Sequence, residues 1–219
     1  MSAFHKLRYR IVEAPNSLGA KSRARRSQLF IALFPNLSEM SVIDLGGTLE
    51  SWRRAPVRPA HVHVVNLEAA DGPVPEWADF DYGDACDLPT SIRGNRYDLV
   101  FSNSVLEHVG GHEQRRQFAD TVHALAPRHW VQTPYRYFPI EPHWLFPGFQ
   151  FLPLSAKAAV AQHWPLAHSQ ATDHSAALRV ALGVELVGRT EMRYLFPLSE
   201  LYNERVLGVT KSLVAFKTS

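Results

Sequence analysis

Acidic residues and glycines directly follow the apolar runs in the first half of the chain. Asp44 and the pair Gly46-Gly47 follow "SVI", and Glu68 follows "HVHVVN", 24 positions beyond Asp44. In nucleotide-binding sheets about 20 residues separate the glycine turn from the acid that binds the ribose. A carboxylate accepts both hydroxyl protons of a ribose, and glycines let the backbone pass close to a ligand. This spacing indicates a nucleoside site.

The residues after the glycine pair bear on whether the ligand carries phosphate. A dinucleotide fold has G-x-G-x-x-G, whose amides and helix N-terminus face a pyrophosphate. Here Gly47 is followed by Thr-Leu-Glu, so the later glycines are missing and Glu50 stands where phosphate charge would lie. This composition suits a ligand without phosphate that carries positive charge. S-adenosylmethionine, a nucleoside with a sulfonium and an amino-acid tail, is such a ligand.

Strands and helices in alternation must position these residues. Apolar, β-branched runs predict buried strands in "MSVIDLGG", "HVHVVNLE", "YDLVFSNS" and "HWVQTP". Apolar side chains at helical spacing predict helices in "KSRARRSQLFIALF" and "HEQRRQFADTVHALAP". This alternation is typical of an open α/β sheet, mostly parallel, with helices on both faces. Ligands of such sheets lie beyond the carboxyl ends of the strands, where the polar residues are found.

Four segments in order resemble a known family. "VIDLGG", "VVNLE", "GDACDLP" and "YDLVFSNSVLEHV" are similar to the successive motifs of class I S-adenosylmethionine-dependent methyltransferases, close to the type 11 group. The resemblance covers Val42 to Pro134 and, more loosely, the rest of the chain. The first motif departs from the usual D-x-G-x-G, because Thr48 replaces the second glycine and Gly47 precedes it. The resemblance implies a Rossmann-like methyltransferase fold with a seven-stranded sheet whose last strand is antiparallel.

The resemblance also implies which residues hold S-adenosylmethionine. The first motif would lie by the methionyl portion, and Glu68 would hold the ribose hydroxyls. Asp84 would reach the adenine amino group, with the backbone amide of Ala85 offered to the ring. Asn103 and Ser104 would border the methionyl tail and the transferable methyl. The full set is Asp44, Gly46, Gly47, Glu68, Asp84, Ala85, Asn103 and Ser104.

Residues 135–170 differ in composition from the rest of the chain. Proline and aromatic residues dominate the start of this segment, and "SAKAAVAQHW" within it predicts a helix. The resemblance implies that insertions of this kind determine acceptor specificity, so we assign the segment to the methyl acceptor. It would be a substrate-cap insertion whose polar contacts are Tyr135, Arg136 and Tyr137. Apolar side chains expected to wall the acceptor cavity are Phe149, Phe151 and Leu152. This lining favours a small or amphipathic acceptor.

Methyl transfer needs little chemistry from the protein itself. It is an in-line displacement at a carbon activated by the sulfonium, so alignment supplies much of the rate. A base is needed when the acceptor is a hydroxyl that stays protonated at neutral pH. His143 or His108 is then the candidate base, with Glu141 or Glu107 as its orienter. The chemistry requires no metal ion.

Several of these patterns also have a purely structural interpretation. Asp84 is a residue type that caps a turn with its own backbone. His108 and His112 superficially suggest a zinc pair, but Gly110-Gly111 interrupts the helix that would place them on one face. "KSRARR" is more typical of a solvated helix face than of a nucleic-acid site, because no aromatic residues are interleaved with it.

The end of the chain predicts the remaining elements of the fold. "SELYNERVLGVTKSLVAFK" would supply the last two strands as a hairpin-like pair, Leu201 to Val206 and Ser212 to Lys217. Before it, "RTEMRYLFP" predicts a short helix with Thr190 as its N-cap.

Composition sets the broad class. The 219 residues predict one domain, 1–219, with a loosely ordered N-terminus at 1–20. The chain is 46% hydrophobic with a net charge of +2, which gives no reason to expect a nucleic-acid partner. A single cysteine, Cys86, fits the cytoplasm, and no apolar run is long enough to span a bilayer. The oligomeric state stays open.

Two alternatives to a methyltransferase remain. A nicotinamide-dependent oxidoreductase on the same sheet would explain Glu68 and the glycine turn, but not the missing phosphate glycines or Glu50. A methyltransferase-like module that binds the cofactor without turnover would share every motif.

Overall fold

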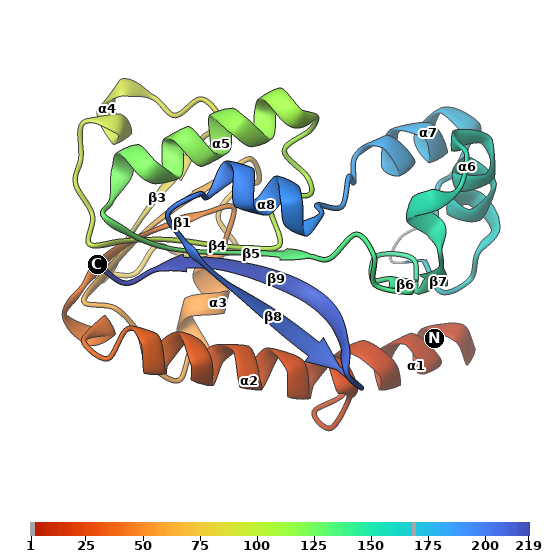
Figure 1. Ribbon diagram of the computed structural model, residues 1–219, viewed down its shortest axis with the longest axis horizontal. Coiled ribbons are helices and arrows are strands. Elements are labelled where there is room, and N and C mark those ends of the chain that lie inside the picture. The colour runs from red at the N-terminus through yellow and green to blue at the C-terminus, as the bar shows by residue number, and fades with distance from the viewer. Residues whose placement is uncertain (1–2, 168–169) are drawn as a thin grey trace.

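A seven-stranded sheet forms the centre of the computed structural model, which describes residues 3–167 and 170–219 (Figure 1). The strand order is β3-β2-β1-β4-β5-β9-β8. Pairs from β3 to β5 are parallel, whereas β9 is antiparallel to both β5 and β8. The strands are β1 (Ser41–Leu45), β2 (His61–Asn66), β3 (Ala78–Tyr82), β4 (Leu99–Asn103), β5 (Arg128–Pro134), β8 (Glu200–Val206) and β9 (Val209–Lys217). This topology confirms the predicted mostly parallel sheet and its antiparallel hairpin.

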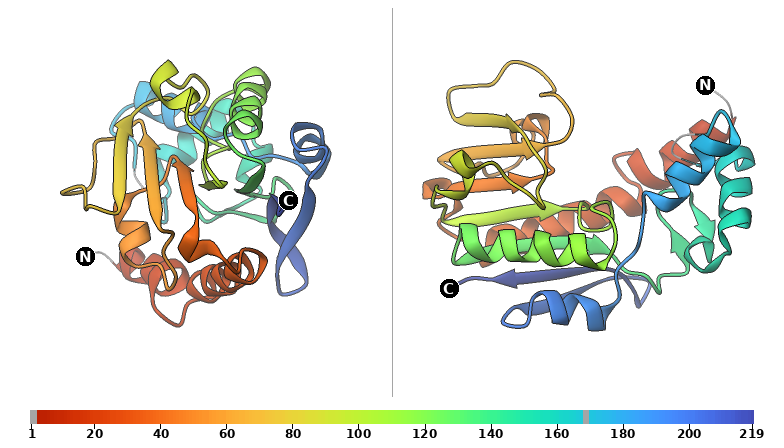
Figure 2. Two further views of the ribbon diagram at one scale, coloured as in Figure 1. Left: turned by 90° about the vertical axis from the view of Figure 1, so that its left-hand side faces the viewer. Right: turned by 90° about the horizontal axis from the view of Figure 1, so that it is seen from above.

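Helices cover both faces of the sheet, as predicted (Figures 1 and 2). On one face α2 (Leu18–Leu33) and α3 (Leu49–Arg53) bury Phe30 and Trp52 against the strands, together with Phe34, which directly follows α2. On the other face lie α4 (Thr90–Arg93), α5 (His112–Leu125) and α8 (Arg189–Leu195). The apolar residues at helical spacing in α5 face the core, as predicted. Phe118 and Val122 are fully buried against that face of the sheet.

The N-terminus of α8 differs from the prediction. Thr190 was expected as the N-cap, but the helix begins at Arg189 and Gly188 is the N-cap residue, with no side-chain cap bond. The backbone N–H of Met192 donates to the carbonyl of Gly188 at 3.0 Å. The first turn therefore runs from Gly188 to Met192, and Thr190 lies inside it.

The N-terminal segment forms helical turns and contacts the part of the chain that follows β5. It contains α1 (Ala3–Arg8) and a π-helical turn (Tyr9–Glu13), and Ser17 caps α2 by accepting from the N–H of Ala20. The guanidinium of Arg8 donates to the carbonyl oxygens of His143 at 3.2 Å and Leu166 at 2.8 Å. The loose order expected for residues 1–20 stays a prediction.

Beyond β5 the chain forms a separate lobe, which we call the cap (Figure 2). It contains β6 (Ile140–Glu141), β7 (Phe146–Pro147), a 3-10 turn (Phe149–Phe151), α6 (Leu154–His163) and α7 (His174–Leu182). Trp144 and Phe149 stack with ring centroids 4.0 Å apart, and small alanine side chains let α6 and α7 pack closely. The predicted helix is present as α6, whereas α7 lies beyond residue 170 and was not predicted.

No helix within residues 3–167 or 170–219 is long and apolar enough to cross a membrane.

Candidate functional site

The glycine pair after β1 is required by the shape of its turn. Gly46 has φ +80°, and a Cβ there would lie 2.5 Å from a methyl carbon of Val105. A Cβ on Gly47 would lie 1.8 Å from Oδ2 of Asp44, far inside any tolerated contact. The amide of Gly46 donates to the carbonyl of Val65 at 2.7 Å, which holds the turn against β2. The chain can therefore fold directly over Asp44 only because both residues lack a side chain.

Asp44 is a buried acid at the carboxyl end of β1. Its side chain is 1% exposed, and Oδ2 accepts a hydrogen bond from Nε1 of Trp52 at 2.7 Å. Its other oxygen, Oδ1, has no hydrogen-bond partner among the described residues. Burial raises the pKa of this carboxyl to about 7, against a smaller lowering by the Trp52 bond. A positively charged ligand group beside Oδ1 would favour the ionised form.

Asn66 links the glycine turn to Glu68 at the end of β2. Its Nδ2 donates to the carbonyl of Gly47 at 2.7 Å, and its Oδ1 accepts from the amide of Glu68 at 3.0 Å. The Glu68 side chain is exposed, beyond the carboxyl end of the strand, as the sequence predicts for a ribose-binding acid. The sequence did not indicate that Asn66 positions it.

Asp84 caps its own turn. Its Oδ1 accepts a hydrogen bond from the amide of Cys86 at 2.8 Å. This bond is the purely structural turn cap that the sequence offered as an alternative for Asp84. Ala85 is buried beside it, while Asp84 itself is exposed. The Cys86 thiol donates to the carbonyl of Gln114, and burial, with the nearby charge of Asp84, raises the pKa of this thiol to about 12. Cys86 is therefore a protonated, unreactive thiol at neutral pH.

Asn103 ends β4, and Ser104 follows it directly. Ser104 has a left-handed backbone conformation with φ 61°, and its Oγ donates to Oε1 of Gln132 at 2.9 Å. The side-chain oxygen of Asn103 is buried and has no hydrogen-bond partner within the described part of the chain. Asn103 thus repeats the feature seen at Asp44, an unpaired buried oxygen at the end of a central strand.

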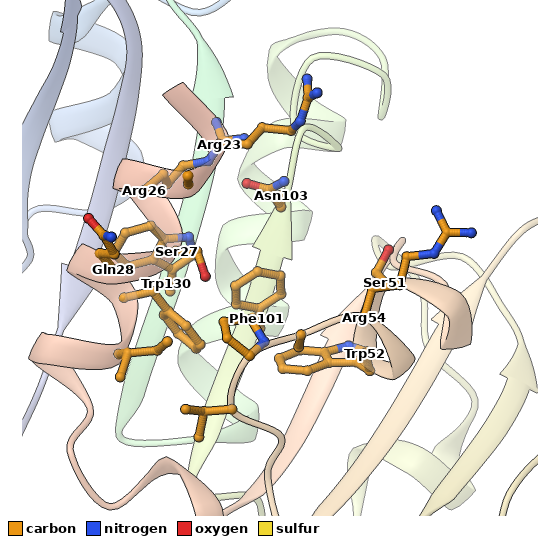
Figure 3. A pocket seen from close by; sticks show the side chains of 16 residues that line it. Arg23, Arg26, Ser27, Gln28, Ser51, Trp52, Arg54, Phe101, Asn103 and Trp130 are labelled. Carbon is orange, nitrogen blue, oxygen red and sulfur yellow. The ribbon is translucent and has the colours of Figure 1, made fainter. Parts of the chain in front are cut away.

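A pocket of about 710 Å³ opens between α2, α3 and the sheet, with Asn103 in its lining (Figure 3). Its apolar part includes Trp52, Phe101 and Trp130. Arg23 and Arg26, from the "KSRARR" segment expected to be a solvated face, also line it (Figure 3). The sequence could not show this, because helical periodicity does not say which neighbour a polar face meets.

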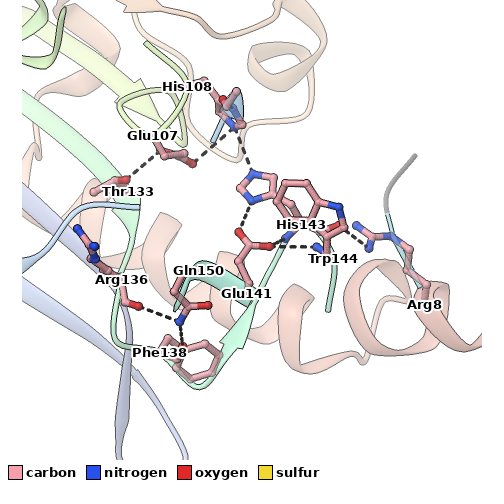
Figure 4. Close-up of polar contacts among 11 residues, drawn as sticks. Arg8, Glu107, His108, Thr133, Arg136, Phe138, Glu141, His143, Trp144 and Gln150 are labelled. Carbon is pink, nitrogen blue, oxygen red and sulfur yellow. Dashed lines mark hydrogen bonds and ion pairs between the residues drawn. The ribbon is translucent and has the colours of Figure 1, made fainter. Parts of the chain in front are cut away.

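The candidate catalytic residues meet where the turn after β4 contacts the cap (Figure 4). Glu107 and His108 lie in the turn after β4, and His143 lies between β6 and β7 of the cap. Nε2 of His143 is 3.2 Å from Nε2 of His108, and Nδ1 of His143 is 2.6 Å from Oε1 of Glu141. The second oxygen of Glu141 accepts the amide of His143 at 2.7 Å. We call Glu107, His108, Glu141 and His143 the histidine cluster.

The two histidines of this cluster have opposite pKa shifts. Burial and the charge of His143 lower the pKa of His108. Burial also acts to lower the pKa of His143, but the hydrogen bond and charge of Glu141 outweigh it, so that pKa is raised. Burial raises the pKa of Glu107 to about 7. Titratable groups whose pKa values are pushed apart in this way are typical of acid–base sites.

The expected acceptor contacts differ in their surroundings. The Tyr135 ring packs against the Tyr137 ring at 5.6 Å and under the guanidinium of Arg189 at 5.8 Å. Tyr137 is 60% exposed, and the side chain of Arg136 points away from the His143 ring (Figure 4). Of the expected apolar wall, Phe149 is buried in the cap core, whereas Phe151 is exposed. The structure therefore does not bring Arg136 to the histidine cluster.

His112 is not a partner of His108. Its Nδ1 is 3.1 Å from Oε1 of Glu191 on α8.

Comparisons with known proteins identify the fold. No protein-family model matches the chain, and no curated protein matches it. Among solved structures, it is similar to magnesium protoporphyrin IX methyltransferase ChlM from Synechocystis PCC 6803 with bound S-adenosylhomocysteine, at 13% identity over 97% of this chain and 91% of that one (TM-score 0.53).

The N-methyltransferase NodS from Bradyrhizobium japonicum WM9, in complex with S-adenosyl-L-homocysteine, is similar at 12% identity over 98% of this chain and 97% of that one (TM-score 0.52). A structure described as a putative zinc-dependent alcohol dehydrogenase from Rhodobacter sphaeroides also matches, at 10% identity over 88% and 87% (TM-score 0.53). The chain thus has the predicted Rossmann-like fold of class I methyltransferases. At these identities the likeness shows the fold alone.

Proposed function

We propose that the protein is a methyltransferase that uses S-adenosylmethionine and acts on a small or amphipathic acceptor. The observation that carries the proposal is the buried carboxyl of Asp44, whose Oδ1 lacks a partner among the described residues beneath the glycine turn. In open α/β sheets the ligand lies at this edge. An ammonium or sulfonium group supplies the positive charge that such an acid favours. Two structures of similar fold, ChlM and NodS, hold S-adenosylhomocysteine.

The start of α3 argues against a dinucleotide. A pyrophosphate needs free amides at the helix N-terminus that follows the first strand. Here the amide of Ser51 donates to Oγ1 of Thr48 at 3.2 Å, and the amide of Glu50 donates to Oδ2 of Asp71 at 3.0 Å. The carboxylate of Asp71 also adds negative charge where a phosphate would lie. A nicotinamide cofactor is therefore disfavoured by charge as well as by the missing glycines.

The cofactor residues have distinct proposed roles. Asp44 faces the charged methionyl portion, and Glu68 accepts the ribose hydroxyls. Asp84 reaches the adenine amino group with the oxygen that does not cap its turn, and the amide of Ala85 faces the ring. The methionyl tail lies by Asn103, whose buried oxygen is otherwise unpaired. Ser104 and the glycine pair Gly46-Gly47 shape the remaining wall.

The acceptor is proposed to lie between the carboxyl ends of β1, β2 and β4 and the cap. The turn from Ser104 to His108 connects the two, since it begins at β4 and ends at the histidine cluster. With a hydroxyl acceptor, His108 takes the hydroxyl proton, and His143 and Glu141 orient the His108 ring. The acceptor oxygen then attacks the methyl carbon. The carbon–sulfur bond breaks with its electron pair left on sulfur, which gives S-adenosylhomocysteine. Tyr135, Arg136 and Tyr137 are the proposed acceptor contacts.

Titration calorimetry with S-adenosylmethionine and S-adenosylhomocysteine tests the proposal. We expect saturable binding of both at one site per chain. A folded protein that gives no heat with either ligand would contradict it. Fluorescence of NADH, measured in parallel, should stay flat, and an enhancement would favour the oxidoreductase alternative. Tight cofactor binding without methylated product in any cell extract would favour a module without turnover.

A further inference from the structure

Three side chains of the histidine cluster converge on one point. One ligand atom from each of Glu107, His108 and His143 can be chosen so that all three lie within 4.8 Å of one another. The two Nε2 atoms are 3.2 Å apart, and Oε1 of Glu107 is 4.0 Å from Nε2 of His108. Two ligand atoms about 2.1 Å from one zinc ion in tetrahedral geometry are about 3.4 Å apart. The histidine spacing already matches such a pair, and Oε1 of Glu107, at 4.0 Å, lies about 0.6 Å beyond it.

The hydrogen bonds of the two Nδ1 atoms determine which tautomer each histidine ring adopts. Nδ1 of His143 faces the Glu141 carboxylate at 2.6 Å, and Nδ1 of His108 faces the carbonyl of Gly183 at 3.2 Å. Both partners are acceptors, so each Nδ1 carries a proton. In the neutral rings both Nε2 atoms then present lone pairs, and these lone pairs face one another. A cation between them, either a proton or a metal ion, is needed to make this arrangement favourable.

Glu107 distinguishes a metal ion from a proton. Its Oε2 accepts from Oγ1 of Thr133 at 2.9 Å, while Oε1 is buried and without a hydrogen-bond partner among the described residues. The residue is 1% exposed, so water does not readily replace the missing partner. A proton shared by His108 and His143 satisfies the two rings but leaves this oxygen unpaired. A metal ion satisfies all three groups.

The surroundings of the three ligands are those of a built site. Metal-binding histidines commonly donate their second N–H to a carboxylate or a backbone carbonyl, which fixes the ring and its tautomer. Glu141 plays this part for His143 and is itself held by the amides of His143 at 2.7 Å and Trp144 at 3.0 Å. The His108 side chain is 40% exposed, so the cluster opens to solvent on that side.

We propose that Glu107, His108 and His143 bind a divalent first-row transition-metal ion such as Zn²⁺ or Mn²⁺, with Glu141 and Gly183 as outer partners. Two imidazoles and one carboxylate, with no thiolate, suit these ions. Three protein ligands leave at least one position for an oxygen from solvent or substrate.

The consequence for catalysis rests on the proposed function. An ion with an open position binds the oxygen of a hydroxyl acceptor and lowers its pKa, so the proton leaves to solvent. That oxygen then attacks the methyl carbon, and the sulfonium becomes a thioether. His108 and His143 serve in this case as ligands and not as the base.

Metal titration of the full-length chain tests the site. Protein freed of metal with EDTA is titrated with Zn²⁺ and Mn²⁺ by calorimetry, and with Co²⁺ by visible absorption, which reports ligation directly. We expect one ion per chain, and an affinity at least about tenfold weaker in His108→Ala and in Glu107→Gln. His112→Ala is the matched control, because its exposed imidazole bonds to Glu191 outside the cluster. Its affinity should equal that of the wild type.

The outcomes separate the two proposals. Absence of ion binding, or equal affinity in His108→Ala and wild type, overturns the metal site and leaves a proton between the histidines. His108→Ala alters an exposed side chain, so its result and the cobalt spectrum decide even if Glu107→Gln does not fold. Titration of the metal-free protein with S-adenosylhomocysteine reports on the methyltransferase proposal separately. Zinc binding without S-adenosylhomocysteine binding would defeat only that proposal.

Discussion

The edge of strands β1, β2 and β4 and the histidine cluster are built in different ways. At the strand edge the backbone makes the shape, through Gly46 and Gly47, and the carboxylate of Glu68 makes no hydrogen bond or ion pair with the described residues. In the cluster, side chains hold one another, with Glu141 fixing His143 and Thr133 fixing Glu107. Under the proposed function, the first region receives a ligand that supplies its own polar groups. The second is organised before any ligand arrives, so changes there should affect chemistry more than cofactor affinity.

The largest expected effect comes from Gly47→Ala at the strand edge. The new Cβ would lie 1.8 Å from Oδ2 of Asp44, so the turn must move and the cofactor site with it. We expect the dissociation constant for S-adenosylhomocysteine to rise by about 100-fold or more, and the free energy of unfolding to fall by about 1–3 kcal/mol. Calorimetry and urea unfolding measure the two effects.

Gly94→Ala is the control for that change. A Cβ at Gly94 meets only the Thr90 carbonyl, at 3.6 Å, an ordinary contact, and the residue has φ −75°. Equal behaviour of the two variants would show that the turn over Asp44 does not shape the cofactor site.

In the histidine cluster, His143→Ala should act on turnover. The change removes a ring that contacts Glu141 and His108, but the two backbone amides that hold Glu141 remain. We expect transfer of labelled methyl from S-adenosylmethionine into a small-molecule extract to fall by about 10²-fold or more, the usual scale for losing acid–base assistance. His112→Ala, outside the cluster, should keep wild-type transfer. Undiminished transfer in His143→Ala would remove the cluster from the mechanism.

The strand edge should also show a smaller, pH-dependent effect through Asp44. Burial raises its folded pKa from 3.8 to about 7, so the folded state binds a proton that the unfolded state releases. This contribution to stability is present below about pH 4 and is lost as the pH rises to about 7. Asp44→Asn removes this pH dependence, so the stability of the variant relative to the wild type should rise by roughly 3 kcal/mol between pH 5 and pH 8. Urea unfolding of both at pH 5 and pH 8 measures the difference, and a gap that does not widen would contradict the raised pKa.

Local sequence signals predicted the strand edge well. The apolar runs that end in Asp44, Asn66 and Asn103 are buried central strands, so pattern and position agree. The edge strand β3, with sequence "ADFDY", was not predicted as a strand because three of its five residues are exposed and the apolar pattern is broken. The five-residue α3 is too short for periodicity to appear. The predicted N-cap of α8 was wrong because a single threonine does not determine where a helix begins.

The histidine cluster was only partly visible in the sequence. His108, Glu141 and His143 were candidates as single residues, but the contact between Glu107 and the cap histidine joins segments about 36 residues apart in the chain. That contact depends on how the cap folds back onto the turn after β4, which no local pattern encodes. The same limit hid the pocket that Arg23 and Arg26 line beside Asn103.

The separation of a cofactor edge from an acceptor cluster is the central claim. It is tested by calorimetric titration of S-adenosylhomocysteine into the wild type, Glu68→Ala and His143→Ala. Charge-assisted hydrogen bonds to the two ribose hydroxyls contribute about 1.5–3 kcal/mol each, less the cost of desolvating the carboxylate. The Glu68→Ala dissociation constant should therefore rise at least about tenfold, since about 1.4 kcal/mol is a factor of ten. The His143→Ala constant should stay within about twofold of the wild type; if it rose as much as that of Glu68→Ala, the two regions would not be separate sites.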